Sequence, residues 1–342
     1  MTVRTGTAVQ INVYPMDLRH VKHLLPHQIR VWGDMVDRIV VTVDVHQSRS
    51  GRYRGKNFAE SLAQLHALLA EHQKRFSKLE VVEVDYRPET LSKVAQYFFG
   101  TSSMPVKAWD GGPFYAYFYG LYATPARYIV HFDGDLLFGG GSRTWLSEAI
   151  ALLESREDVL LVSPFPGPPR EDGRLFGHQQ DQGFSFAREP MESLAYRFSH
   201  ASTRIFAIDM VRFEQTLGAF PLIPPHAIQR LKAKLLGNPP IAREAEVILS
   251  IALERSKLLR IDFLGTAPGL WGLHPPYRSE EFYTRLPEII ERVEQNRVPE
   301  AQRGDYELND SIIDWTEARA ATRWHRRYFR LLRDRLSRPS FG

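Results

Sequence analysis

The feature that most constrains the fold is an alternation of short apolar strands with amphipathic helices through the first two thirds of the 342 residues. Helices that connect successive strands make right-handed crossovers, which place the strands in a mainly parallel sheet flanked by helices. The sequence therefore predicts the α/β class, with a Rossmann-like sheet. Strands are expected at 8–14, 38–43, 79–84, 128–132 and 159–162, and helices at 20–32, 57–76, 115–122 and 144–153.

The regular pattern weakens after Ser163. A proline-rich stretch, Pro164 to Pro169, is expected to begin a long polar loop that runs to about Pro190. Beyond it the sequence predicts strands at 204–208 and 259–264 and a helix at 244–258. We therefore expect three parts: a first half with the regular alternation (1–163), a second half that supplies the other wall of a cleft (164–275), and a C-terminal helical extension with a basic tail (276–342).

The charge of the chain is unevenly distributed. The formal net charge is +4, but residues 316–342 hold eight arginines and only two acids, so residues 1–315 are slightly acidic. A mildly acidic body does not indicate nucleic-acid binding. The tail has the spacing of a basic amphipathic helix, whose apolar stripe either contacts an anionic membrane surface or packs onto the body. The apolar residues of that stripe are Trp324, Tyr328, Leu331, Leu332 and Leu336.

Several classes of protein are excluded by residues the chain lacks. Without cysteine there is no disulfide framework, no thiolate nucleophile and no cysteine-based zinc site. No apolar stretch reaches the roughly 18–20 residues of a spanning helix. The N-terminus does not read as a signal peptide. We expect a cytoplasmic protein, which would touch the inner face of the membrane if the basic tail binds lipid.

The strongest chemical signal is the triplet Asp133-Gly134-Asp135, which follows the expected strand at 128–132. A buried strand would deliver two carboxylates to the carboxyl edge of the sheet, where ligands of α/β proteins bind. Hard cations such as Mn²⁺ and Mg²⁺ prefer carboxylate oxygens and keep positions open for phosphates. We expect Asp135 to be a direct metal ligand, and Asp133 to hold a ribose or a metal-bound water. The alternative is a turn with two solvated acids.

The block from Asp110-Gly111-Gly112 to Asp135 resembles the corresponding block of family 2 glycosyltransferases with the GT-A fold. The resemblance implies a UDP- or GDP-linked sugar donor and a divalent metal, with residues 1–163 as the half that binds the nucleotide-sugar and residues 164–275 as the half that binds the acceptor. It also implies that Tyr14 and Pro15 lie beside the nucleotide, that Asp44 binds the base, and that Asp110 belongs to the donor site.

Two departures from the family pattern matter. The basic residue usual in the helix before the acidic triplet is replaced by Tyr115 to Tyr119, and only Asp44 matches the family's acidic motif after the second strand. The Gln-x-x-Arg-Trp motif of processive synthases is absent, so a processive polysaccharide synthase is not expected.

Two further acids and one histidine complete the set of candidates. Aligned with the family on Leu249, Glu246 takes the position of the catalytic acid, with Glu244 as the second candidate. A carboxylate there would take the proton of an acceptor hydroxyl. Both acids could instead be ordinary glutamates of a first helical turn. His274 is a candidate third metal ligand, or else a surface histidine before Pro275.

These features together predict a metal-dependent glycosyltransferase. It would move a sugar from a nucleotide-diphosphate donor to a hydroxyl of a saccharide or lipid-linked acceptor, with inversion favoured over retention. One rival is a sugar nucleotidyltransferase, which would need a glycine-rich basic loop after the first strand, where this chain has Tyr14 to Arg19 without glycine. The other is a non-catalytic nucleotide- or carbohydrate-binding protein.

Overall fold

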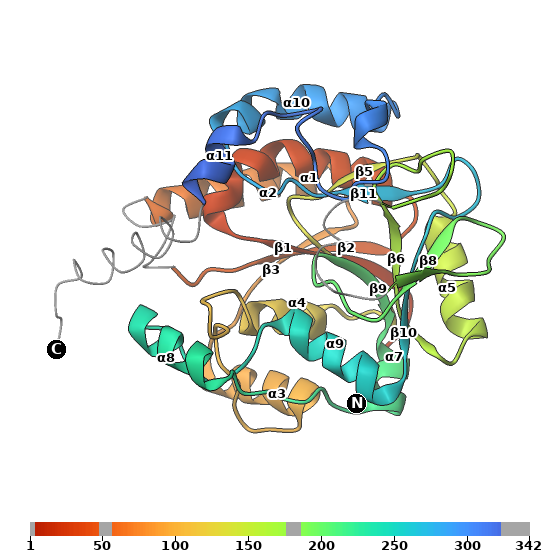
Figure 1. Ribbon diagram of the computed structural model, residues 1–342. Helices are drawn as coiled ribbons and strands as arrows, with labels where there is room; N and C mark the ends of the chain where they lie inside the picture. Colours follow the sequence, from red (N-terminus) through yellow and green to blue (C-terminus); the bar gives the residue numbers. More distant parts are fainter. Residues whose placement is uncertain (1–3, 48–56, 176–185, 323–342) are drawn as a thin grey trace.

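The computed structural model describes residues 4–47, 57–175 and 186–322. It contains a mixed sheet of eleven strands, in the order β3-β2-β1-β4-β9-β6-β10-β8-β7, with β11 paired to β6 and β5 paired to β11 (Figure 1). The strands are β1 (Thr7–Val13), β2 (Arg38–Val43), β3 (Leu79–Glu83), β4 (Tyr128–Asp133), β5 (Leu137–Gly139), β6 (Val159–Pro166), β7 (Phe186–Arg188), β8 (Ala195–Phe198), β9 (Ile205–Asp209), β10 (Leu259–Phe263) and β11 (Trp271–Leu273).

The directions of the strands confirm the α/β class, with one refinement. Strands β3, β2, β1 and β4 are parallel neighbours, and β6 and β10 are parallel to each other. Strand β9 lies between β4 and β6 and is antiparallel to both, and β8 is antiparallel to β10. The sheet is therefore mostly parallel but mixed, because short antiparallel strands from the later part of the chain enter it.

Helices cover both faces of the sheet. Helices α1, α2 and α10 lie on one side of it in Figure 1, and α3, α4, α8 and α9 lie on the other. Separate apolar cores fill the two interfaces. The helices are α1 (Leu18–Trp32), α2 (Phe58–Arg75), α3 (Pro88–Phe99), α4 (Tyr115–Ala123), α5 (Trp145–Ser155), α7 (Met210–Arg212), α8 (Ala227–Leu236), α9 (Ala245–Ser256), α10 (Glu280–Glu294) and α11 (Thr316–Ala321), with short turns of other helix types at η1 (Pro15–Asp17), η3 (Phe213–Leu217) and η4 (Glu300–Gln302).

The register of the first strands explains where a site can form. Asn12 of β1 is paired with Asp133 of β4, and Val13 is paired with Val43 of β2. The three parallel strands therefore end level with one another. The residues that follow them leave the sheet at one edge, as the sequence predicts.

The proline-rich stretch is where the prediction fails. Pro164 to Pro166 continue strand β6 and are buried, whereas the sequence predicts that a polar loop begins at Pro164. Phe165 is paired with Trp271 of β11, and this pairing supplies the tertiary contact that extends the strand. Residues 176–185 of the expected loop lie outside the described part of the chain.

The C-terminal part begins with α10, which packs on α1, and continues through η4 to α11. The basic tail from Arg323 onward lies outside the described residues, so its predicted amphipathic helix stays a prediction. The division at residue 163 also stays a prediction, and segments on either side of it contribute strands to the one sheet. In the described part of the chain, no helix combines the length and apolarity needed to span a membrane.

Candidate functional site

A cavity of about 450 Å³ opens at the edge where β1, β2 and β4 end. We call it the acid-pair cavity, after Asp133 and Asp135 in its wall. The loop before α4 and the start of α9 complete the wall. The cavity brings together seven of the nine predicted site residues: Tyr14, Asp44, Asp110, Asp133, Asp135, Glu244 and Glu246.

The two other candidates do not line this cavity. Pro15 is buried and begins the η1 turn, so its ring shapes the chain behind Tyr14. His274 follows β11 and approaches the acid pair from the side, with Nε2 3.9 Å from Oδ2 of Asp135.

One end of the cavity has an aromatic and polar character. Asp44 accepts hydrogen bonds from the hydroxyl of Tyr86 (2.7 Å) and from the backbone N–H of His46 (2.9 Å). The ring centres of Tyr86 and His46 are 5.3 Å apart. Tyr14 lines the same cavity. Flat apolar faces beside a fixed carboxylate suit a planar, hydrogen-bonding ligand group.

The loop before α4 forms another part of the rim. Asp110 accepts a hydrogen bond from the backbone N–H of Gly112 (2.9 Å), which holds the chain in a tight turn. Gly111 has φ +90°, a backbone conformation that residues with a Cβ rarely adopt. The Asp-Gly-Gly sequence therefore sets the shape of this rim.

The pKa values of the two acids are shifted in opposite directions. Burial raises the pKa of the Asp133 carboxyl well above its ordinary value, and the charge of Asp135 adds to this effect. Burial alone would also raise the pKa of Asp135, but nearby basic groups, Arg278 foremost with His274, His20 and Arg204, together outweigh burial and hold that pKa below its usual range. Arg278 forms an ion pair with Oδ2 of Asp135, while Oδ1 has no hydrogen-bond partner among the described residues.

His274 connects the acid pair to a second polar group. Its Nδ1 is 2.6 Å from Nη1 of Arg204, which also pairs with Glu307 at 3.1 Å. A guanidinium can only donate, so Nδ1 of His274 accepts and the proton of the neutral ring lies on Nε2. Burial lowers the pKa of His274 to about 4, so the ring is neutral near pH 7. In this arrangement His274 turns an N–H toward Asp135.

The charge of the cavity decides what could bind there. Seven of the described residues that line it are Asp or Glu, whereas only Lys107 and Arg204 are basic. A phosphate or diphosphate would meet net repulsion unless a cation accompanied it. The described residues contain no ready-made cluster of three His, Cys, Asp or Glu ligands. Magnesium-type sites commonly use one or two carboxylates and complete the shell with substrate phosphates, and the free oxygen of Asp135 fits that pattern.

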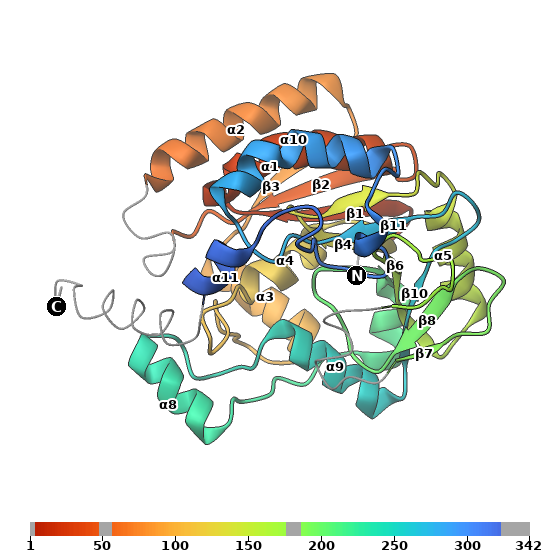
Figure 2. The ribbon, with the colours of Figure 1, turned by 45° about the horizontal axis from the view of Figure 1, so that its top comes forward.

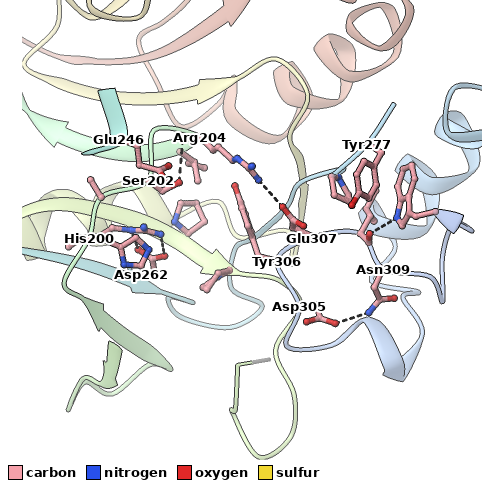
Figure 3. Close-up of a pocket in the computed structure, with 18 of the residues that line it drawn as sticks. His200, Ser202, Arg204, Glu246, Asp262, Tyr277, Asp305, Tyr306, Glu307 and Asn309 are labelled. Atoms are coloured by element: carbon pink, nitrogen blue, oxygen red, sulfur yellow. Dashed lines mark hydrogen bonds and ion pairs between the residues drawn. The ribbon is translucent and has the colours of Figure 1, made fainter. Parts of the chain in front are cut away.

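A second cavity, of about 320 Å³, shares lining residues with the first. Figure 3 shows the residues that line this second cavity. We call it the C-terminal cavity, because residues 305–310 supply one of its walls. Its arginines are paired: Arg260 with Asp262, Arg319 with Asp310, and Arg204 with Glu307. Its other described lining residues are Pro164, Pro166, His200, Ala201, Ser202, Ile205, Glu246, Pro276, Tyr277, Asp305, Tyr306, Leu308, Asn309 and Trp315.

Glu246 and Arg204 line both cavities, so the two spaces meet at these side chains. Glu246 lies in the first turn of α9, and its Oε2 accepts a hydrogen bond from the backbone N–H of Thr203 at 3.3 Å. Glu244 lines the acid-pair cavity only, and its carboxylate pairs with Arg243 at 3.2 Å. Of the two glutamates, Glu246 alone stands where groups in both cavities can reach it.

Tyr117 of α4 lies close to both sets of acids. Its hydroxyl is buried without a hydrogen-bond partner among the described residues, and it lines the acid-pair cavity. Burial raises its pKa well above the ordinary value, with further contributions from the charges of Asp133 and Glu246. A neutral phenol at this position can donate a hydrogen bond to a ligand oxygen.

Sequence reasoning missed Tyr117, Arg204, Arg278 and Glu307 as site residues. Only the first carries a signal, because the tyrosines of Tyr115 to Tyr119 stand where the resembling family has a basic residue. Arg204 reaches the site because β9 is antiparallel to β4, which places its backbone carbonyl 3.0 Å from the N–H of Asp133.

Comparisons with known proteins give structural similarity only. No family profile and no curated protein matches the sequence. Among solved structures, the chain is similar to GalNAc-T7 with UDP, GalNAc and Mn²⁺ (13% identity, TM-score 0.41, 81% of this chain and 44% of that chain). It is also similar to residues 1–349 of S. aureus TarS with UDP (10%, 0.36, 87% and 68%) and to the galactosyltransferase LgtC with donor and acceptor sugar analogues (12%, 0.32, 87% and 99%). The chain thus spans less than half of the GalNAc-T7 chain.

Proposed function

We propose that this chain is a metal-dependent glycosyltransferase, which transfers a hexosyl group from a nucleotide-diphosphate sugar to a hydroxyl acceptor with inversion. The observation that carries the proposal is the meeting of two cavities at Glu246. One cavity has the acid pair and an aromatic end, and the other is rich in paired polar groups. A reaction between two substrates needs this arrangement, with the base between them.

The donor would occupy the acid-pair cavity. The aromatic end formed by Tyr14, Tyr86 and Asp44 suits the base, with the sugar directed toward Glu246. The family resemblance of the block from Asp110 to Asp135 supports the same orientation.

A divalent cation would be held by Asp135, with Asp133 and the donor diphosphate completing the site. When bound, Mn²⁺ or Mg²⁺ neutralises charge that develops on the leaving diphosphate. The support is the excess of carboxylates in the cavity, together with the buried unpartnered oxygen of Asp135. For His274 to join as a ligand through Nε2, its Nδ1 would have to carry the proton, which requires release from Arg204.

The chemistry assigned to the protein is proton transfer and positioning. Glu246 takes the proton of the acceptor hydroxyl as its oxygen attacks the anomeric carbon. The bond from that carbon to the diphosphate oxygen breaks, and the nucleoside diphosphate departs. Attack from the acceptor side, opposite the leaving group, inverts the anomeric centre. Arg204 and Arg278 bring positive charge to the side where the diphosphate leaves.

The acceptor would enter the C-terminal cavity. Each of its three arginines is paired with a carboxylate, while Glu246 and Asp305 have no cationic partner among the described residues. An anionic acceptor is disfavoured by this balance, and an uncharged polyol or saccharide is favoured. A lipid-linked saccharide would meet the same requirement if its lipid part stays outside.

The test is hydrolysis and transfer with purified protein. A panel of UDP, GDP and dTDP sugars is screened by thermal shift with Mn²⁺ and with EDTA, because a ligand of the folded state raises the melting temperature. The best donor is then assayed for release of nucleoside diphosphate. We expect a metal-dependent shift and metal-dependent release of the diphosphate. Release of pyrophosphate from a nucleoside triphosphate would indicate a nucleotidyltransferase, and binding without turnover would indicate a binding protein.

A further inference from the structure

The described surface has one concentration of exposed apolar residues, and it lies far from the strands of the sheet. The large hydrophobic side chains most exposed to solvent are Ile228 (70%), Leu231 (60%), Leu235 (51%) and Ile241 (51%). All four belong to α8 or to the loop that follows it. Large apolar side chains gathered on one surface commonly mark an interaction site.

The geometry of α8 gathers these residues on one face. Ile228, Leu231 and Leu235 are spaced by three and four residues, so they lie along one stripe of the helix. Its opposite side packs on the body through the buried Ala233. Figures 1 and 2 both place α8 at the periphery of the molecule. The apolar stripe therefore points away from the protein.

The segment of the chain that carries the stripe has charges of one sign. From Gln215 to Arg243 the chain contains no Asp or Glu, and it contains four basic residues, Arg230, Lys232, Lys234 and Arg243. On the helix, Lys232 lies on one side of the apolar stripe, while Arg230 and Lys234 lie on the other. Long basic side chains beside an apolar stripe can reach anionic headgroups while the stripe enters the interface.

We propose that α8 and the loop to Ile241 dock on an anionic membrane surface, lying in its plane. The combination of exposed leucine and isoleucine with basic side chains on the same helix favours an anionic lipid surface, which offers negative headgroups above an apolar layer. The docking does not depend on the proposed reaction.

Docking at α8 would also place the acid-pair cavity near the surface. Asn238 donates from Nδ2 to the carbonyl oxygen of Trp109 at 3.3 Å, and the N–H of Trp109 donates to Ala242 at 3.0 Å. Trp109 belongs to the loop that carries Asp110 and lines the cavity. The docking segment is thus hydrogen-bonded to the rim of the site, and a substrate held in the membrane could reach it.

The test is flotation of the full chain with vesicles of phosphatidylcholine alone, and with vesicles that contain 30 mol% phosphatidylglycerol, at roughly 0.05 and 0.5 M salt. We expect binding to the anionic vesicles only, weakened by salt. The double variant Leu231→Ser/Leu235→Ser should lose at least about tenfold in binding, because the stripe no longer enters the interface. Its melting temperature should stay close to that of the native protein, since both side chains are exposed.

A matched control is Lys74→Glu/Arg75→Glu, which reverses two exposed charges at the end of α2, on the other side of the sheet. It should bind vesicles as the native chain does, whereas Arg230→Glu/Lys234→Glu should not. Equal loss in both charge variants would show a general charge effect and overturn the proposal. So would unchanged binding of the Leu231→Ser/Leu235→Ser variant.

The same experiment distinguishes two alternatives: docking through the basic tail, and contact between two copies of the chain through the stripe. If Arg326→Gln/Arg327→Gln/Arg330→Gln abolishes flotation while the leucine variant binds normally, the basic tail is the docking element and the proposal for α8 is wrong. If the native chain floats with neither vesicle and sediments as a dimer that Leu231→Ser/Leu235→Ser converts to a monomer, the stripe is a contact between two copies.

Discussion

Replacing Glu246 by glutamine is the most direct test of the proposed reaction. The change removes a charge and a proton acceptor but almost no volume. We expect kcat to fall by about 10²–10⁴-fold, the usual loss when a general base is removed. At about 1.4 kcal/mol for each factor of ten, this is an increase of about 3–5 kcal/mol in the activation barrier. The donor KM should change little, because Glu246 faces the space between the two cavities.

The structure predicts that this variant folds normally. Among the described residues, the carboxylate has one hydrogen-bond donor, the backbone N–H of Thr203, and the 3.3 Å separation makes that a long hydrogen bond. The amide oxygen of glutamine can accept the same bond. The free energy of unfolding should therefore change by less than about 1 kcal/mol. Urea denaturation at pH 7.5 measures this change and separates a catalytic loss from a folding loss.

The matched control is Glu244→Gln, two residues earlier. Glu244 lines only the acid-pair cavity and pairs with Arg243, so its loss should alter kcat by less than about tenfold, and stability by less than about 1 kcal/mol, as for partly exposed ion pairs. Steady-state release of nucleoside diphosphate, with and without acceptor, gives kcat and KM for both variants. An inactive Glu244→Gln beside an active Glu246→Gln would refute the assignment of the base.

Three further changes test other parts of the site and fold. Asp135→Asn should abolish metal-dependent turnover without unfolding the protein, measured by activity against Mn²⁺ concentration and by melting temperature. Arg278→Gln should raise the donor KM about tenfold or more, because a charge-assisted contact near the diphosphate is lost; an unchanged KM would remove Arg278 from the donor site. Burial lowers the pKa of His27, which accepts from the N–H of Phe138 at 2.9 Å and contacts Glu294 at 2.7 Å. The unfolded chain therefore binds more protons as pH falls below 6.5, and native stability drops there. In urea unfolding, His27→Leu should cost about 1–3 kcal/mol at pH 7.5 and show a smaller drop at pH 5.5.

The sequence predicts the first half of the fold well because its signals there are local. The β-branched run Arg38 to Val43 is a strand with the bounds expected, and the apolar stretch Tyr128 to Phe132 ends at the acid pair. Parallel strands joined by helices must then end at one edge, so Tyr14, Asp44 and Asp133 meet without further information. Helix α3 is absent from the predicted elements, although it has clear local signals, a proline at its first position and a left-handed Gly100 at its end.

The second half is less predictable because tertiary pairing sets its structure. Pro164 to Pro166 read as a loop, since proline is rare inside sheets. They form strand because β11 pairs beside them, a contact between residues more than one hundred positions apart in the chain. Helix α8 is short and keeps its apolar residues on the outside, so its stripe points away from any core the sequence could suggest.

The direction of β9 is what joins the two cavities. Had this strand run parallel to β4, its first residues would lie at the opposite edge of the sheet from Asp133. Because β9 is antiparallel, its beginning meets the end of β4, and Arg204 comes to stand between the acid pair and Glu307. The same geometry places the N–H of Thr203 against Glu246. The direction of this strand thus orients the proposed base and places a positive charge where the two substrates would meet. No residue pattern within 200–210 predicts that direction.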